Sequence, residues 1–144
     1  MKQVKVGLIG ANWMGSFHSV GLNNVRQAYH DVDPVFEHVA DVNEAAAKLA
    51  AERFGYKKVS TDWHDVVNDP EVDLVIIATP NFTHAEIAIA AAEAGKHILC
   101  EKPMANTLAE GKAMVEAIEK AGVKSLVDFI YTKCPANVLA KELM

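Results

Sequence analysis

The stretch VKVGLIGANWMG, residues 4–15, decides the fold of this chain. Residues 4–9 are rich in β-branched side chains and end at Gly10, which is typical of a strand closed by a turn. Residues 14–28 follow with the pattern of a helix, although Gly21 weakens it. A strand that passes through a glycine turn into a helix is the first half of a βαβ unit. We therefore expect an α/β protein.

The same alternation of strand and helix continues along the chain. Further strands are expected over residues 35–40, 57–60, 73–78, 96–101 and 125–129. Helices are expected between them, over residues 44–54 and 62–68 and from residues 83 and 107, and a last one begins at 135. Residues 73–78 are almost entirely apolar, as in a parallel strand buried on both faces. The pattern predicts a doubly wound parallel sheet with the strand order 3-2-1-4-5-6.

Two of these helices have capping boxes, Thr83-x-x-Glu86 and Thr107-x-x-Glu110, at their beginnings. The helix after the second box carries apolar or small residues at a spacing of three and four, namely Leu108, Gly111, Val115, Ile118 and Gly122. This spacing predicts that one face of the helix packs toward the sheet.

The composition describes one ordinary domain. The chain has 144 residues, of which 51% are hydrophobic, and a net charge of -5, which argues against nucleic acid or an anionic membrane as the main partner. It lacks an apolar run long enough to span a bilayer, and its N-terminus lacks the pattern of a signal peptide. Cys100 and Cys134 are too few for a disulfide framework and do not have metal-ligand spacing. We therefore expect a cytoplasmic protein without a metal site.

The turn at residues 10–15 has the position of a dinucleotide fingerprint. Gly10 would allow the tight turn and Gly15 the close approach of helix to sheet, so that the helix N-terminus faces a pyrophosphate. Position 12, however, is Asn instead of the usual second glycine. Asn tolerates left-handed geometry, and its side chain is expected to crowd the pyrophosphate or to donate to it. The alternative is a plain structural turn.

Asp41 ends the second predicted strand. A carboxylate at this place can accept hydrogen bonds from ribose hydroxyls and would repel a 2′-phosphate. Because neither Arg nor Lys follows directly, the sequence favours NAD over NADP. The alternative is that Asp41 caps the next helix.

Polar residues also end the fourth and fifth predicted strands. Thr79 and Asn81 flank Pro80 after the fourth strand, and Glu101 and Lys102 close the fifth. Since ligands of open α/β sheets bind at the carboxyl ends of the strands, Lys102 is the candidate catalytic residue, sharing in proton transfer. The alternatives are a solvated loop lysine, and ordinary strand-end and capping roles for Thr79 and Asn81.

Two histidines receive simpler interpretations from the sequence. His18 follows Gly15 by three residues on one helix face and is expected to be a packing residue. His84 lies in the first turn of the next helix after Asn81, where a histidine by itself is more often structural or exposed.

Taken together, GLIG (7–10) with WMG (13–15), ATPNFTH (78–84) and EKP (101–103) closely resemble the glucose–fructose oxidoreductase / inositol dehydrogenase family over the whole chain. The resemblance implies an N-terminal Rossmann domain that binds NAD or NADP. It implies that the adenosine and pyrophosphate side is held by Gly10, Ala11, Asn12, Trp13, Met14, Gly15 and Asp41. It places Thr79, Pro80, Asn81 and His84 along the cofactor cleft. Glu101 and Lys102 would lie near the nicotinamide, and Lys102 would be shared with the substrate.

The chain departs from the family pattern at two places. Asn12 replaces the second glycine, and Ile130-Tyr131-Thr132 stands where the family often has an Asn-Tyr-Arg-like run. Family members also continue into a second α/β domain that binds substrate and forms the oligomer. We expect residues 1–132 to be the dinucleotide-binding domain and residues 133–144 to begin the connection to a substrate domain absent from this chain, which is expected to be a piece of a longer protein.

The resemblance predicts an NAD(P)-dependent oxidoreductase that transfers hydride between nicotinamide and a sugar, polyol or related alcohol. The 144 residues alone are expected to be nearly inactive, and the full-length protein is expected to be a homo-oligomer. One alternative is a non-catalytic NAD(P)-sensing module, which Asn12 and Thr132 favour. Another is a family member that acts on a non-sugar substrate.

Overall fold

The computed structural model describes the backbone of residues 1–144 and the side chains of all of them except Arg26 and Lys133. The strands are β1 (Lys2–Ile9), β2 (Val32–Ala40), β3 (Lys58–Ser60), β4 (Leu74–Ile77), β5 (His97–Cys100) and β6 (Ser125–Val127). The α-helices are α1 (Trp13–Ala28), α2 (Glu44–Phe54), α3 (Trp63–Val67), α4 (His84–Glu93), α5 (Leu108–Ala121) and α6 (Pro135–Leu143). Short 3-10 helices, η1 (Asn81–Thr83) and η2 (Ile130–Lys133), precede α4 and α6.

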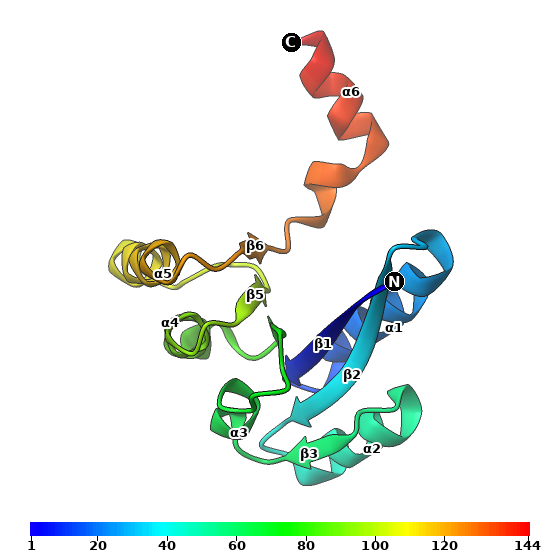
Figure 1. The fold of residues 1–144 in the computed structure, drawn as a ribbon. Coiled ribbons are helices and arrows are strands. Elements are labelled where there is room, and N and C mark those ends of the chain that lie inside the picture. The colour runs from blue at the N-terminus through cyan, green and yellow to red at the C-terminus, as the bar shows by residue number, and fades with distance from the viewer.

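The strands form one parallel sheet in the order β3-β2-β1-β4-β5-β6, so the predicted doubly wound fold is confirmed. Helices α1 and α2 cover one face, and α3, α4 and α5 cover the other (Figure 1). Each face has its own apolar core. Along β4, for example, Val75 and Ile77 belong to the core under α3, α4 and α5, whereas Ile76 belongs to the core under α1 and α2. This two-sided burial explains the continuous apolar pattern of the strand.

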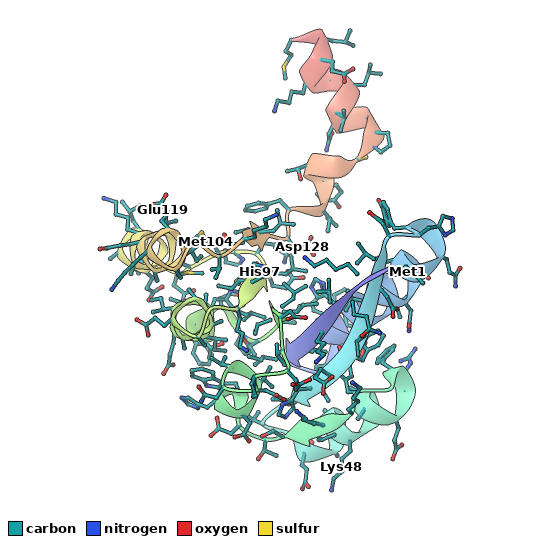
Figure 2. The ribbon with its side chains drawn as sticks, viewed as in Figure 1. Met1, Lys48, His97, Met104, Glu119 and Asp128 are labelled. Atoms are coloured by element: carbon teal, nitrogen blue, oxygen red, sulfur yellow. The ribbon has the colours of Figure 1, made fainter. Side chains whose placement is uncertain are left out.

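The last helix lies apart from these layers. Figure 1 shows α6 extending beyond β6, and Figure 2 shows side chains projecting from several sides of this helix, apart from the sheet. All residues of α6 are exposed, including Leu139 and Leu143. Among the described residues, no helix combines the length and the apolar content that a membrane span requires.

A register shift in β2 brings its end level with that of β1. Val6 pairs with Phe36, but the next residue, Gly7, pairs with His38, so that Glu37 is an extra residue in β2. Such a bulge moves all later residues of a strand by one position along its partner. As a result Ala40 lies opposite Ile9, and the residues after them, Asp41 and Gly10, also lie side by side.

Local details differ from the sequence prediction at three places. Strand β2 begins at Val32 and includes Pro34, which is tolerated because β3 pairs only with the far end of β2. Thr107 and Glu110 form the predicted capping box, but the box at Thr83 was wrong. The Thr83 hydroxyl is engaged by Thr79 and by the Pro80 carbonyl, so it is not available to α4.

The predicted inward face of α5 was only partly right. Leu108 is 76% exposed and Val115 is 43% exposed, whereas Met114 is buried. Ala117 and Ile118 pack beside Met114 against the core under α4. The inward face therefore includes Ile118, as predicted, but it is centred on Met114, whereas Leu108 and Val115 of the predicted stripe lie outside it.

A buried ionic cluster attaches the loop before β4 to strands β2 and β3. The Asp69 carboxylate accepts hydrogen bonds from Lys58 Nζ at 2.7 Å and lies 3.0 Å from His38 Nδ1. Burial would raise the pKa of Asp69, but the hydrogen bonds from Lys58, from the Glu71 N–H and from His38 lower it to about 2. Lys96 Nζ donates to the carbonyls of Asp69 and Val72, so the same loop is also held from the other side.

Replacing Asp69 by Asn should destabilise the chain by about 2 kcal/mol at pH 7, because the Lys58 ammonium loses the carboxylate charge with which it pairs. A carboxylate whose folded-state pKa is lowered stabilises the fold above its ordinary value of 3.8, and this contribution disappears as the pH falls from there toward 2. Urea unfolding at pH 7 and at pH 3 should therefore show a smaller difference between Asp69→Asn and the wild type at the lower pH. Glu44→Gln, at an exposed ion pair, is the control, and equal losses for the two variants at pH 7 would contradict this account.

Candidate functional site

The site lies at the carboxyl edge of the sheet, where the register aligns the strand ends. The last level of the ladder joins Ser60, Ala40, Ile9, Ile77, Cys100 and Val127. The residues that follow these strand ends form an edge row, namely Asp41, Gly10, Ala78, Glu101 and Asp128. Each of them donates its backbone N–H to the neighbouring strand, at 2.8–3.3 Å. The predicted site residues from four different strands are thus brought to one edge.

The glycine turn allows close backbone contact at two points. Gly10 has φ +95°, and a Cβ atom built on it would lie 2.5 Å from the Ala78 carbonyl oxygen. A Cβ atom on Gly15 would lie only 2.0 Å from the Gly10 carbonyl oxygen. Both positions therefore require glycine, as predicted, and the first turn of α1 lies close against the end of β1.

Asn12 has a different role from the one expected. Its φ of -73° is not left-handed, so the position does not use the tolerance of Asn for that geometry. Its side-chain amide donates to Asp41 Oδ2 at 3.0 Å instead of projecting over the helix. It also does not cap α1, and α1 has no acidic residue in its first turn. The positive end of the α1 dipole is therefore not neutralised by an acidic side chain of the first turn.

Asp41 holds the turn in place and does not cap the next helix. It is 7% exposed, and Oδ2 also accepts from the Ala11 N–H at 2.8 Å. Oδ1 accepts from the Asn43 N–H at 2.9 Å, while Asn43 itself caps α2. A carboxylate oxygen has two acceptor positions, so Oδ1 keeps one for a ligand hydroxyl.

The segment after β4 divides into an exposed part and a buried part. Pro80 and Asn81 are exposed at the edge, and the Thr79 hydroxyl lies 2.6 Å from that of Thr83. His84 is fully buried, with Nε2 at 2.9 Å from the Thr79 carbonyl oxygen and Nδ1 at 2.9 Å from the Pro103 carbonyl oxygen. The structure thus places the His84 ring behind the strand edge, as a link between two loops.

Lys102 belongs to a turn, Glu101 to Pro103, that contains a cis Lys102–Pro103 peptide bond. We call these three residues the lysine turn. Glu101 is 4% exposed, and its Oε2 accepts the Lys102 backbone N–H at 3.0 Å, whereas the Lys102 residue itself is exposed. The lysine side chain is therefore presented outward by a turn whose neighbouring carboxylate faces inward.

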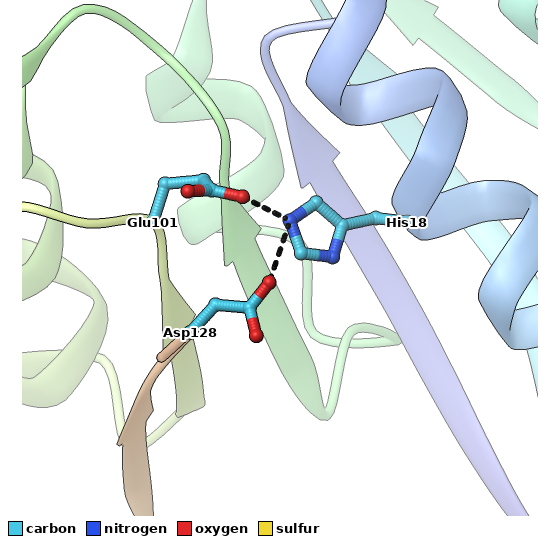
Figure 3. A group of neighbouring side chains, drawn as sticks. All are labelled: His18, Glu101 and Asp128. Atoms are coloured by element: carbon cyan, nitrogen blue, oxygen red, sulfur yellow. Dashed lines mark hydrogen bonds and ion pairs between the residues drawn. The ribbon is translucent and has the colours of Figure 1, made fainter. Parts of the chain in front are cut away.

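Two residues that the sequence prediction did not place in the site lie beside Glu101. His18 Nε2 is 3.0 Å from Glu101 Oε1 and 3.8 Å from Asp128 Oδ2 (Figure 3). His18 was expected to be a packing residue, but its ring meets two carboxylates. Asp128 could have been found from the sequence, because it follows the sixth strand at the edge position that Glu101 has after the fifth strand. The three ligand-type groups lie within 4.8 Å of one another, and because His18 Nε2 is at hydrogen-bond distance from Glu101 Oε1, we interpret them as a hydrogen-bonded cluster.

A groove with a volume of about 910 Å³ opens beside this cluster. It is bordered by α1, by β4 and β5, and by the segment after β6. Its lining residues are Trp13, Met14, Phe17, His18, Gly21, Leu22, Val25, Ile76, Leu99, Glu101, Lys102 and residues 128–132. Among the predicted site residues, Trp13, Met14, Glu101 and Lys102 therefore face the groove, next to the glycine turn.

Cys100 contributes packing to this edge. Burial and the neighbouring Glu101 carboxylate raise the pKa of its thiol to about 12, so the thiol stays protonated. Cys100 is therefore a core thiol.

The fold and this edge define a dinucleotide-binding Rossmann domain. A glycine turn with no space for a Cβ, a helix N-terminus without an acidic side chain, and a carboxylate at the end of β2 are the elements that hold a dinucleotide.

Comparisons with known proteins agree with this class. A family model described as an oxidoreductase family with an NAD-binding Rossmann fold matches residues 4–129. Levoglucosan dehydrogenase from Pseudarthrobacter phenanthrenivorans is 44% identical over 144 residues, covering 99% of this chain and 37% of that protein. Myo-inositol 2-dehydrogenase from Thermotoga maritima is 33% identical over 120 residues, covering 83% of this chain and 34% of that protein. A structure of levoglucosan dehydrogenase with NADH and levoglucosan matches with a TM-score of 0.93 at 44% identity, covering 98% of this chain and 38% of that one.

The chain therefore belongs to this oxidoreductase family, and the predicted family and NAD-binding Rossmann domain are confirmed. The chain spans only 34–38% of the length of these relatives, so most of each relative has no counterpart in the 144 residues.

Gly15→Ala tests the close contact between α1 and the turn. Because the new Cβ would lie 2.0 Å from a backbone oxygen, the helix has to shift, and we expect a loss of about 1–3 kcal/mol in urea unfolding. Gly21→Ala, in the same helix, is the matched control because its Cβ meets nothing within 4 Å. It should stabilise the chain by about 0.5–1 kcal/mol. Equal stabilities of the two variants would contradict the close contact.

Proposed function

We propose that this chain is the nucleotide-binding part of an NAD-dependent oxidoreductase that acts on a sugar, a polyol or a related alcohol. The observation that carries the proposal is the edge row, which sets Gly10 and Asp41 on one side of the β1–β4 boundary and Glu101 with Lys102 on the other. Ligands of doubly wound sheets bind across this boundary. The relatives named as levoglucosan and myo-inositol dehydrogenases support the substrate class.

Residues 10–15 and Asp41 would hold the adenosine and pyrophosphate side of the cofactor. The α1 dipole favours the pyrophosphate, and the acceptor position left on Asp41 Oδ1 suits a ribose hydroxyl. A 2′-phosphate would instead meet a buried carboxylate, which favours NAD over NADP. Thr79, Pro80 and Asn81 would border the same cleft from the β4 side.

Lys102 would act at the other end of the cofactor. Bound NAD supplies the hydride acceptor. The exposed ammonium group of Lys102 would orient the substrate hydroxyl beside the groove and stabilise the oxygen as its proton leaves. In this proposal the main acid and base come from a second domain, and residues 133–144 begin the connection to it, since the family match ends at residue 129. The protein would work in the cytoplasm as a homo-oligomer, without nucleic acid as a partner.

Asp41→Ala tests the cofactor half of this proposal. It removes the acceptor for ribose and for the Ala11 and Asn12 donors, so NADH affinity should fall about tenfold or more in a fluorescence titration. The wild type should prefer NADH to NADPH, and the variant should lose this preference. Asp31→Ala, in the exposed loop before β2, is the control. A full-length protein that binds neither cofactor would refute the proposal.

Lys102→Met tests the chemical half in the full-length protein. The variant keeps the length of the side chain but has no charge or donor, so kcat with NAD and the best polyol or sugar should fall about 100-fold or more. The dissociation constant of NADH should stay nearly unchanged, because Gly10 and Asp41, which would hold the adenosine and pyrophosphate side, lie across the β1–β4 boundary from Lys102. Lys48→Met, on the exposed side of α2, is the control. NADH binding without turnover on any sugar, polyol or other alcohol would instead support the alternative of a cofactor-sensing module.

A further inference from the structure

We propose that His18 and His84 are positioning residues that fix the lysine turn from the two faces of the sheet. The inference rests on the proposed function, in which Lys102 meets the substrate. Both histidines would affect the position of Lys102 indirectly, through the groups that hold the lysine turn.

The backbone of the lysine turn is held at each of its three residues. The Glu101 N–H donates to the Ile77 carbonyl at 3.0 Å, which continues the ladder from β4. The Lys102 N–H donates to Glu101 Oε2 at 3.0 Å. The Pro103 carbonyl oxygen lies 2.9 Å from His84 Nδ1. Two of these three partners, the Glu101 carboxylate and the His84 ring, are side chains, so the shape of the turn depends on where they are held.

His84 holds the turn from the face covered by α4. Its ring is fully buried and lies between the Thr79 and Pro103 carbonyl oxygens, each at 2.9 Å. It therefore contacts both the loop after β4 and the loop after β5 with a single rigid ring. A flexible side chain would allow the two loops to move apart, whereas an imidazole fixes the separation of its two nitrogens.

His18 holds the turn from the opposite face, which α1 covers. Its Nε2 lies 3.0 Å from Glu101 Oε1 and 3.8 Å from Asp128 Oδ2, so it sits between the ends of β5 and β6 (Figure 3). Since the other Glu101 oxygen accepts the Lys102 N–H, His18 acts on Lys102 through one carboxylate. The side chain of His18 is only 11% exposed, and this limits competition from water.

Both histidines belong to helices that begin at the proposed cofactor cleft. His18 is three residues after Gly15, in the helix whose first turn would meet the pyrophosphate, and His84 opens α4 after the Thr79–Asn81 segment. A movement of the first turn of α1 or α4 would therefore also move the histidine that contacts the lysine turn. The arrangement places the reactive lysine in a fixed relation to both walls of the cleft.

The experiment uses the full-length protein and two readouts. His18→Ala removes the donor to Glu101, whereas His18→Gln keeps an N–H at a similar reach. We expect His18→Ala to lower kcat about 10- to 100-fold with little change in the KM for NAD, and His18→Gln to recover most of the activity. The rate at which an amine-reactive acetylating reagent labels Lys102, measured by peptide mass spectrometry, should change in His18→Ala and return in His18→Gln.

His84→Ala should also lower kcat with little change in the KM for NAD, and it should change the labelling of Lys102. His84→Asn should recover both readouts, as His18→Gln does for His18. His30→Ala, in the exposed loop after α1, is the matched control and should leave all readouts unchanged. Because His84 is fully buried, circular dichroism and thermal unfolding are used to identify any His84 variant that fails to fold. In that case the comparison of His18→Ala with His18→Gln tests the inference.

A folded His18→Ala protein with wild-type kcat and wild-type Lys102 labelling would overturn the inference. So would His18→Gln behaving like His18→Ala in both readouts, because the role would then be one of packing. A wild type that binds no NADH would refute the proposed function instead, and the labelling comparison can still be made on the 144-residue chain.

Discussion

The parallel ladder that ends level across the sheet is the constraint on which the rest of the structure depends. Each residue of the edge row donates its N–H to the neighbouring strand, so the position of one strand end determines the next. The bulge at Glu37 is part of this constraint. Without it, Gly10 would lie opposite Ala40, and Asp41 would be one position further along the edge. Its carboxylate would then lose the Ala11 N–H, and the glycine turn would lose the group that holds it.

The two halves of the edge use the same device. On the β2 side, the buried Asp41 carboxylate accepts the Ala11 N–H and the Asn12 amide. On the β5 side, the buried Glu101 carboxylate accepts the Lys102 N–H and faces His18. A buried carboxylate is costly unless donors surround it, and here those donors are the backbone of the adjacent turns and one side chain each. The cost of burial is therefore offset only when each turn has one particular shape.

The sequence predicted what depends on local pattern. Alternating strands and helices, the strand order, Gly10, Gly15 and the family motifs all follow from spacing along the chain, and the structure agrees. What it did not predict depends on partners remote in sequence. The Thr83 hydroxyl bonds to Thr79 and Pro80 instead of capping α4, and His18 meets Glu101, which is 83 residues away. On α5, the spacing correctly included Ile118 but missed Met114, whose burial depends on packing against residues outside the helix.

Asn12 shows why a departure from a motif need not remove its function. The second glycine of a fingerprint leaves space for the pyrophosphate, and an Asn side chain pointing outward would fill that space. Here the Asn12 amide turns toward Asp41, so the side chain is withdrawn from the start of α1 and adds a second donor to the carboxylate. The hydrogen bond to Asp41 therefore holds the Asn12 side chain away from the start of α1. Asn12 and Asp41 should be treated as one unit, because replacing Asp41 would release the amide toward the pyrophosphate position as well as remove the ribose acceptor.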